Sequence, residues 1–187
     1  MRLYDPEYAR RRSTRLKGYD YAQIGAYFVT ICTHERALVL GDVIDGAVTL
    51  NAAGGVVEEE WLRTFAVRPN VDLDAYVVMP NHVHGVIVIR KSASVTPEQR
   101  PLAVAQSARQ TLGAVVRGFK GACVRRLGTE PMVPTPAWQR NFYEHIIRDD
   151  KDLDRIRDYI EQNPHRWSAR TAEERGILQR TPIAGES

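Results

Sequence analysis

The chain has 187 residues, of which 43% are hydrophobic and 26% charged, a composition typical of one soluble globular domain. Its net charge of +3 is a weak argument for an anionic partner, and two cysteines in apolar segments argue against a disulfide framework. Because no apolar run is long enough to span a bilayer and no secretory signal is evident, we expect a cytoplasmic protein without a membrane contact.

The N-terminal part of the chain predicts an arm, a strand and a hairpin. Residues 1–24 are polar and rich in arginine, and we interpret them as a basic N-terminal arm. The β-branched and aromatic run over 26–32 is typical of a buried strand. Within the short apolar runs of 37–50, Asp45-Gly46 indicates the turn of a β-hairpin.

The middle of the chain predicts a helix followed by two strands. Asn51 suits the N-cap of a helix whose apolar stripe runs from Val56 to Phe65. Two strands, Asp74–Met79 and Val83–Ile89, flank Pro80-Asn81, which we expect to form a turn or bulge.

Two more helices follow, separated by a short strand. Apolar residues at steps of three and four predict a long helix over Leu102–Leu127, and the segment Trp138–His145 is expected to contain the start of a strand. Asp149 or Asp150 can cap the last helix, and Pro164 is expected to end it because the residue before a proline disfavours a helical backbone.

This order of elements favours an α+β fold. We predict a ferredoxin-like split β-α-β sandwich with a central antiparallel sheet and a C-terminal helix that carries a tyrosine. The core domain is expected to span residues 25–167, and residues 168–187 form a polar tail.

Two histidines lie in the apolar run of the second middle strand. Since successive side chains of a strand point to opposite faces, His82 and His84 share one face and Val83 points to the other. Burying two imidazoles without a common ligand is costly, so the pair indicates a site for one divalent cation. A structural role remains the alternative, because no zinc-binding spacing supplies further ligands.

The last helix carries a second candidate group. Tyr159 and Asn163 are four residues apart and therefore lie on one helix face, one turn from each other. A tyrosine hydroxyl can act as a nucleophile and form a covalent intermediate, and an asparagine carbonyl oxygen could complete a metal shell. Spacing alone favours the ordinary alternative, in which a helical tyrosine is a packing residue.

Basic residues cluster in the arm and along the long helix. Such clusters can neutralise phosphates, although a solvated arm and an exposed helix face are the plainer interpretation. The candidate contacts to a nucleic-acid backbone are Arg11, Arg12, Arg15, Lys17, Arg117 and Lys120.

Four segments carry a resemblance to a known family: Gly25–Thr30, Val77–His84, Trp138–Arg148 and Asp158–Pro164. Together they resemble the motifs of REP-associated tyrosine transposases, a branch of the HUH single-tyrosine transposases. The resemblance runs from about Arg12 to Trp167 with the motifs in family order. The combination is specific, whereas no single motif would be.

The resemblance implies a metal-dependent nuclease and strand transferase for single-stranded DNA. It implies that His82 and His84 bind Mg²⁺ or Mn²⁺ and that Tyr159 forms a covalent 5′-phosphotyrosine intermediate. Asn163 stands where many relatives have glutamine as a third metal ligand. Its side chain is one methylene shorter, so direct coordination by Asn163 is left open.

The implied substrate is single-stranded DNA in which imperfect palindromes form hairpins. Arg140 lies in a matched segment and is a candidate phosphate contact, and a bacterial protein of this kind is expected to associate with the nucleoid. Relatives act as monomers or homodimers. Two alternatives stay open: a non-catalytic hairpin-binding protein derived from a transposase, and an RRM-type RNA binder, against which the missing aromatic RNP segments argue.

Overall fold

The computed structural model describes residues 24–90, 111–129 and 138–169. In chain order, the elements are β1 (Gly25–Cys32), the 3₁₀ turn η2 (His34–Arg36), β2 (Gly41–Ile44), β3 (Ala47–Leu50), α1 (Ala52–Ala66), β4 (Val71–Met79), β5 (His82–Ile89), α3 (Leu112–Leu127), β6 (Tyr143–Ile147) and α4 (Asp150–Glu161). The predicted basic arm, the first part of the predicted long helix and most of the polar tail lie outside the described residues.

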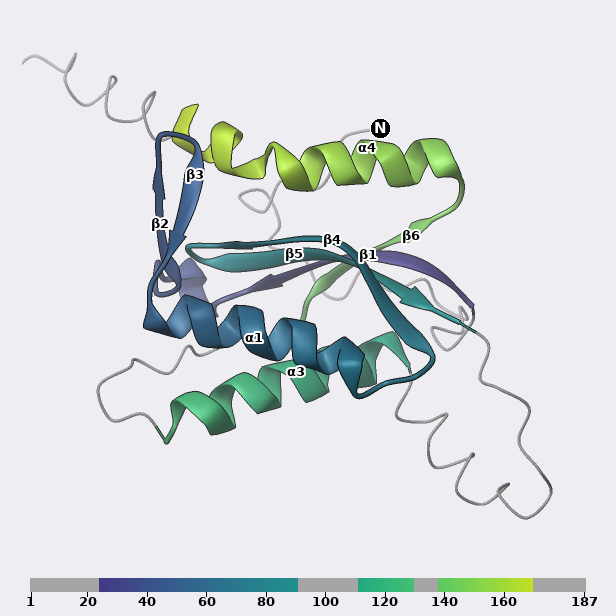
Figure 1. Ribbon diagram of the computed structural model, residues 1–187, viewed down its shortest axis with the longest axis horizontal. Helices are drawn as coiled ribbons and strands as arrows, with labels where there is room; N and C mark the ends of the chain where they lie inside the picture. Colours follow the sequence, from purple (N-terminus) through teal and green to yellow (C-terminus); the bar gives the residue numbers. More distant parts are fainter. Residues whose placement is uncertain (1–23, 91–110, 130–137, 170–187) are drawn as a thin grey trace, which may run out of the picture.

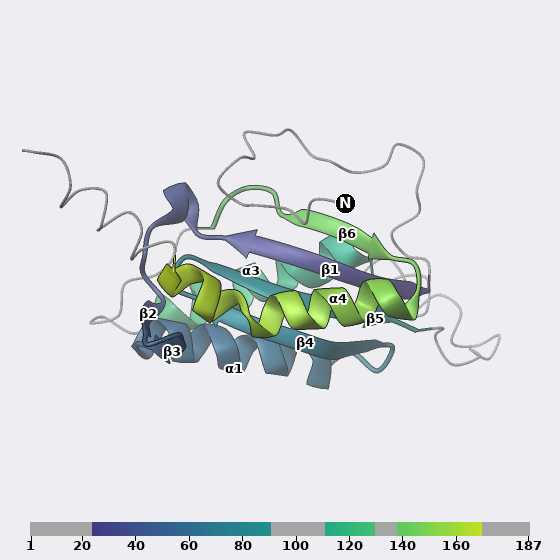
Figure 2. The same ribbon diagram turned by 90° about the horizontal axis from the view of Figure 1, so that it is seen from above.

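The larger sheet has four strands in the order β4-β5-β1-β6, and every neighbouring pair is antiparallel. Helices α1 and α3 cover one face of this sheet, and α4 lies across the other (Figures 1 and 2). Strands and helices therefore follow the ferredoxin-like split β-α-β order, and the predicted α+β fold is confirmed.

Local signals set several element boundaries. Asp45 and Gly46 both have positive φ, at 51° and 77°, which gives the predicted two-residue turn between β2 and β3. Asn51 caps α1, because its Oδ1 accepts a hydrogen bond of 3.0 Å from the Gly54 amide. In the same way, Asp149 caps α4 by accepting from the Asp152 amide at 2.8 Å.

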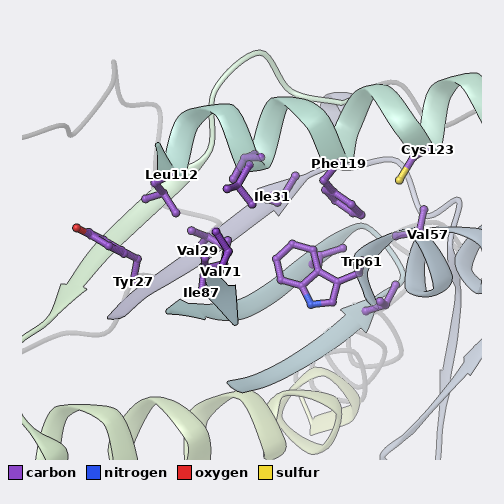
Figure 3. Packing of buried hydrophobic residues seen from close by; sticks show 14 of the residues in the cluster. Tyr27, Val29, Ile31, Val57, Trp61, Val71, Ile87, Leu112, Phe119 and Cys123 are labelled. Atoms are coloured by element: carbon purple, nitrogen blue, oxygen red, sulfur yellow. The ribbon is translucent and has the colours of Figure 1, made fainter. Parts of the chain in front are cut away.

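The main apolar core lies between the sheet and the two helices α1 and α3 (Figure 3). Trp61 is fully buried there and packs edge-to-face on Phe119, with ring centroids 5.0 Å apart. Gly85 of β5 makes room for this indole, since a Cβ at that position would lie 2.3 Å from Trp61 Cζ2. The core thus depends on the odd-numbered residues of β5.

The end of the last helix differs from the prediction. Helix α4 ends at Glu161, but after Gln162 the backbone is helical again over residues 163–169. Pro164 therefore does not stop the helical path. It stands in the first turn of the second segment, where its missing N–H removes no hydrogen bond and its fixed φ suits a helix.

Two polar contacts fix α4 on the sheet. Arg157 donates from Nε to Asp74 Oδ1 at 2.8 Å and from Nη2 to Oδ2 at 2.6 Å, joining α4 to β4. His145 Nε2 lies 2.8 Å from Asp152 Oδ2, joining β6 to the first turn of α4.

In the part of the chain that the structure describes, no helix has the length and apolar character needed to cross a membrane.

Candidate active site

His82 and His84 lie at the start of β5 on the face that α4 covers. The register pairs them with Cys32 and Thr30 of β1, and their side chains are 3% and 0% exposed. Their ring centroids are 4.3 Å apart. The prediction that the two imidazoles share one face of a strand is confirmed.

Both imidazole rings are oriented by a hydrogen bond at Nδ1. Nδ1 of His82 lies 2.6 Å from Asn81 Oδ1, and Nδ1 of His84 lies 2.9 Å from Thr30 Oγ1. An amide oxygen only accepts, so Nδ1 of His82 is the donor, and in the neutral imidazole Nε2 then carries the lone pair. A hydroxyl can accept in the same way from His84. This is the outer-shell arrangement that presents Nε2 of a histidine to a metal ion.

Tyr159 of α4 packs directly on this histidine pair. Its ring centroid is 5.2 Å from that of His84 and 5.9 Å from that of Phe28, which it meets edge-on at 88°. Only 8% of Tyr159 is exposed, because Phe28, Val86, Ile156 and Ile160 surround it in a small apolar cluster. The tyrosine and the paired histidines of one and the same chain therefore meet in one site.

The helical segment 163–169 extends α4 over the site. Asn163 is 2% exposed, and its Oδ1 is buried without a hydrogen-bond partner among the described residues. Trp167 lies over His82, with ring centroids 6.0 Å apart, and Arg166 Cζ is 5.4 Å from the centroid of the Tyr159 ring. Trp167 and Arg166 thus lie beside the histidines and the tyrosine, and Asn163 is buried four residues after Tyr159.

The donor set fits a divalent cation only in part. Within the described residues, no group of three or more histidine, cysteine, aspartate or glutamate side chains could hold a metal ion. The two imidazoles and the buried carbonyl of Asn163 offer nitrogen and oxygen donors, a mixture compatible with Mn²⁺ or Mg²⁺. The remaining positions would belong to water and to substrate oxygens, as in a catalytic rather than a structural site.

The predicted DNA contacts that fall within the described residues do not gather at this site. Arg117 and Arg140 are exposed. Arg117 belongs to α3, which lies on the opposite side of the sheet from α4 (Figure 1), and Arg140 stands just before β6. Lys120 of α3 donates to the carbonyls of Gln139 and Asn141 at 2.7 and 3.0 Å, and burial lowers the pKa of its ammonium group to about 8. The other four candidates, Arg11, Arg12, Arg15 and Lys17, lie outside the described residues. No observation tests a DNA contact of any of the seven residues, so all seven stay predictions.

Sequence reasoning missed the side chains that complete the site. Thr30 reaches His84 only through the pairing of β1 with β5, and no spacing along the chain encodes that register. Asn81 was assigned to the turn, although its position beside His82 was a usable signal. Arg166 and Trp167 were missed because Pro164 was expected to end the helix.

The comparisons with known proteins agree with the motifs. No protein-family model matches the chain. A Haemophilus influenzae protein described only as uncharacterized is 37% identical over 169 residues, which cover 88% of this chain and 93% of that protein. A second protein of the same organism, described as a "putative REP-associated tyrosine transposase", is 67% identical over 27 residues, 14% of this chain and 15% of that protein.

One solved structure has the same fold. It is that of a REP-associated tyrosine transposase bound to a REP hairpin, with a TM-score of 0.56 over 82% of this chain and 73% of that chain. The 20% identity in this superposition supports the fold alone. The motif set, the fold and the short strongly identical match therefore agree in their direction: the chain resembles the REP-associated tyrosine transposases.

Proposed function

We propose that this protein cuts and rejoins single-stranded DNA that forms hairpins, through a covalent bond between Tyr159 and a 5′-phosphate. One observation carries the proposal: the Tyr159 ring lies 5.2 Å from His84, in the same buried site as His82. A chain that only binds DNA has no chemical use for a tyrosine packed on two oriented imidazoles. The solved relative supports a hairpin as substrate, because it was determined with a REP hairpin bound.

The reaction needs a nucleophile, an oriented phosphate and a stabilised leaving group. Tyr159 Oη would attack the scissile phosphorus, so that an O–P bond to tyrosine forms while the bond from phosphorus to the 3′-oxygen breaks. The phenol proton passes to solvent and the departing 3′-oxygen takes up a proton. The phosphodiester energy is kept in the tyrosine linkage, so a 3′-hydroxyl can reverse the step and join strands without a nucleotide triphosphate.

His82 and His84 would hold Mg²⁺ or Mn²⁺ through Nε2, with Asn163 Oδ1 as the candidate third protein ligand. A bound divalent cation polarises a phosphoryl oxygen and stabilises charge that develops on the leaving oxygen. The Asn81 oxygen favours the tautomer of His82 that such binding requires, and the Thr30 hydroxyl is compatible with the same tautomer of His84. The buried oxygen of Asn163, which has no partner among the described residues, supports its place in this set.

Each chain would carry a complete site, because Tyr159 packs on the histidines of its own chain. On this proposal, a monomer can form the covalent intermediate. A homodimer could still exchange strands between two such sites. The proposal is tested by mixing Tyr159→Phe with His84→Ala: if sites are complete within one chain, the mixture stays inactive.

The principal experiment measures a covalent protein–DNA adduct. The full chain is incubated with a single-stranded hairpin oligonucleotide and Mn²⁺, then denatured and resolved by electrophoresis. We expect an adduct with the wild-type chain, none with Tyr159→Phe or His82→Ala, and unchanged DNA binding by Tyr159→Phe. Shifted DNA without any adduct would favour the non-catalytic hairpin-binding protein instead, and normal cleavage by His82→Ala would overturn the metal assignment.

A further inference from the structure

A guanidinium group lies against the proposed nucleophile. Arg166 Cζ is 5.4 Å from the centroid of the Tyr159 ring, a cation–π distance. The Arg166 side chain is exposed, and its Nη2 donates to Gln162 Oε1 at 3.2 Å, one helical turn away. Since Tyr159 is buried against the sheet by its other neighbours, Arg166 stands at the solvent side of the ring, where a DNA strand would approach.

The two arginines of α4, Arg155 and Arg157, each bind a carboxylate, and Arg166 differs from them. Arg155 donates to Asp152 at 2.7 Å, and Arg157 is bound to both carboxylate oxygens of Asp74. In the described ranges 24–90, 111–129 and 138–169, no carboxylate lies within ion-pair distance of Arg166. Its positive charge is thus uncompensated beside a site that is proposed to act on phosphate.

The backbone that carries Arg166 is held in place on both sides. The tip of the β2–β3 hairpin reaches the helical segment 163–169 that follows α4 (Figure 1), and the Gly46 amide donates to Ser168 Oγ at 3.2 Å. His165 fits against Gly46 so closely that a Cβ there would lie 2.1 Å from its Nδ1. Trp167 packs on His82. Arg166 therefore extends from a segment whose position relative to the histidines is defined.

We propose that Arg166 is a catalytic residue that binds a non-bridging oxygen of the scissile phosphodiester while Tyr159 attacks the phosphorus. The inference rests on the proposed function and names a residue that its motifs do not contain. A guanidinium offers two parallel N–H donors that match two phosphate oxygens, and it keeps its charge throughout the reaction. It neither gives nor takes a proton: its part is to stabilise negative charge as the O–P bond to Tyr159 forms and the bond to the 3′-oxygen breaks.

The test compares a native scissile phosphate with a neutral one. The cleavage position is first mapped with the wild-type chain, and a single methylphosphonate, which replaces one charged oxygen by a methyl group, is then placed there. Rate constants of adduct formation at saturating and limiting DNA are measured for wild type, Arg166→Ala, Arg166→Lys and the control Arg63→Ala. Arg63 lies on α1 across the sheet, so the control removes the same charge far from the site.

We expect Arg166→Ala to lower the rate constant at saturating native DNA about 100-fold, with a smaller change in the half-saturating concentration. Arg166→Lys should recover part of the loss, and Arg63→Ala should match wild type. On the methylphosphonate substrate, Arg166→Ala and wild type should react at similar rates. Thermal melting curves of the variants should coincide, since an exposed side chain is changed.

Three results would overturn the inference, and they are distinguishable. Equal adduct formation by wild type and Arg166→Ala on native DNA removes the role of Arg166 and leaves the proposed function intact. An equal loss on both substrates shows that Arg166 positions Tyr159 and does not touch the charged oxygen. Absence of any adduct with the wild-type chain removes the proposed function, and the inference with it.

Discussion

The two faces of the central sheet receive different kinds of side chain from the same strand, β5. Toward α1 and α3, β5 presents Val83, Gly85 and Ile87, which pack into an apolar core. Toward α4, the same strand presents His82 and His84, whose ring nitrogens need partners. The first face supplies most of the buried apolar area, and hence most of the stability. The second face buries polar ring nitrogens, which costs free energy wherever hydrogen bonds do not compensate for the lost hydration.

Trp61→Ala should produce the largest loss of stability. The indole is fully buried between α1, α3 and β5, so its removal leaves a cavity that the two helices cannot close. We expect a decrease of about 3–5 kcal/mol in the free energy of unfolding, measured by urea titration. The matched variant on the other face, His84→Ala, should cost clearly less. Equal losses in the free energy of unfolding would contradict the conclusion that the face toward α1 and α3 supplies most of the stability.

Gly85→Ala should destabilise the same core through overpacking. The new Cβ would lie 2.3 Å from Trp61 Cζ2, so the indole or the strand must shift. A decrease of about 1–3 kcal/mol in the free energy of unfolding is expected. Gly55→Ala on α1 is the control, because a Cβ there meets nothing within 4 Å and a helix favours alanine over glycine. If both variants were equally stable, the close packing of Trp61 on β5 would be wrong.

Gly46→Ala should affect the site more than the core. The residue has a φ of +77°, and a Cβ would lie 2.1 Å from His165 Nδ1. We expect a loss of about 1 kcal/mol in stability from the backbone alone and a slower rate of adduct formation, because segment 163–169 must move. The double variant Gly46→Ala/His165→Ala lacks the obstructing imidazole, so it should regain the rate of adduct formation but not the lost stability. No recovery of the rate would show that the hairpin does not position the segment.

Asp74→Asn should have the smallest effect, and the effect should depend on pH. The hydrogen bond from Arg157 lowers the pKa of the Asp74 carboxyl below its ordinary value. A lowered carboxyl pKa contributes stability above the unfolded value of about 4, and this contribution is lost as the pH falls through the folded value. The variant should therefore be about 0.5–1 kcal/mol less stable than wild type at pH 7, with a difference that shrinks below pH 4. A difference independent of pH would contradict the ion pair.

The sequence predicted those parts of the fold that depend on local patterns. Alternation placed His82 and His84 on one face, Asn51 and Asp45-Gly46 marked a helix start and a turn, and the order of elements gave the ferredoxin-like sheet. These features follow from backbone geometry within a few residues. The expected α+β class and the histidine arrangement are confirmed for this reason.

The rest of the site depends on contacts between segments far apart in the sequence. Thr30 and His84 are 54 residues apart and meet through strand register, and the contact of Gly46 with Ser168 spans 122 residues. The helical backbone continues past Pro164, and the sequence did not predict this. A proline is equally compatible with a position just after a helix end and with the first turn of a new helix, so the residue alone does not distinguish the two. Arg166 could be placed over Tyr159 only once that path was known.

The most direct measurement identifies the residue to which DNA becomes attached. Adduct formed by the wild-type chain with a 3′-labelled hairpin oligonucleotide, whose label stays with the covalently bound fragment, is digested, and the modified peptide is sequenced by mass spectrometry. We predict that the nucleotide is linked by its 5′-phosphate to Tyr159, in the peptide that contains Asp158 and Ile160. Linkage to another residue, or an unmodified Tyr159 in a chain that cleaves the same DNA, would contradict the account.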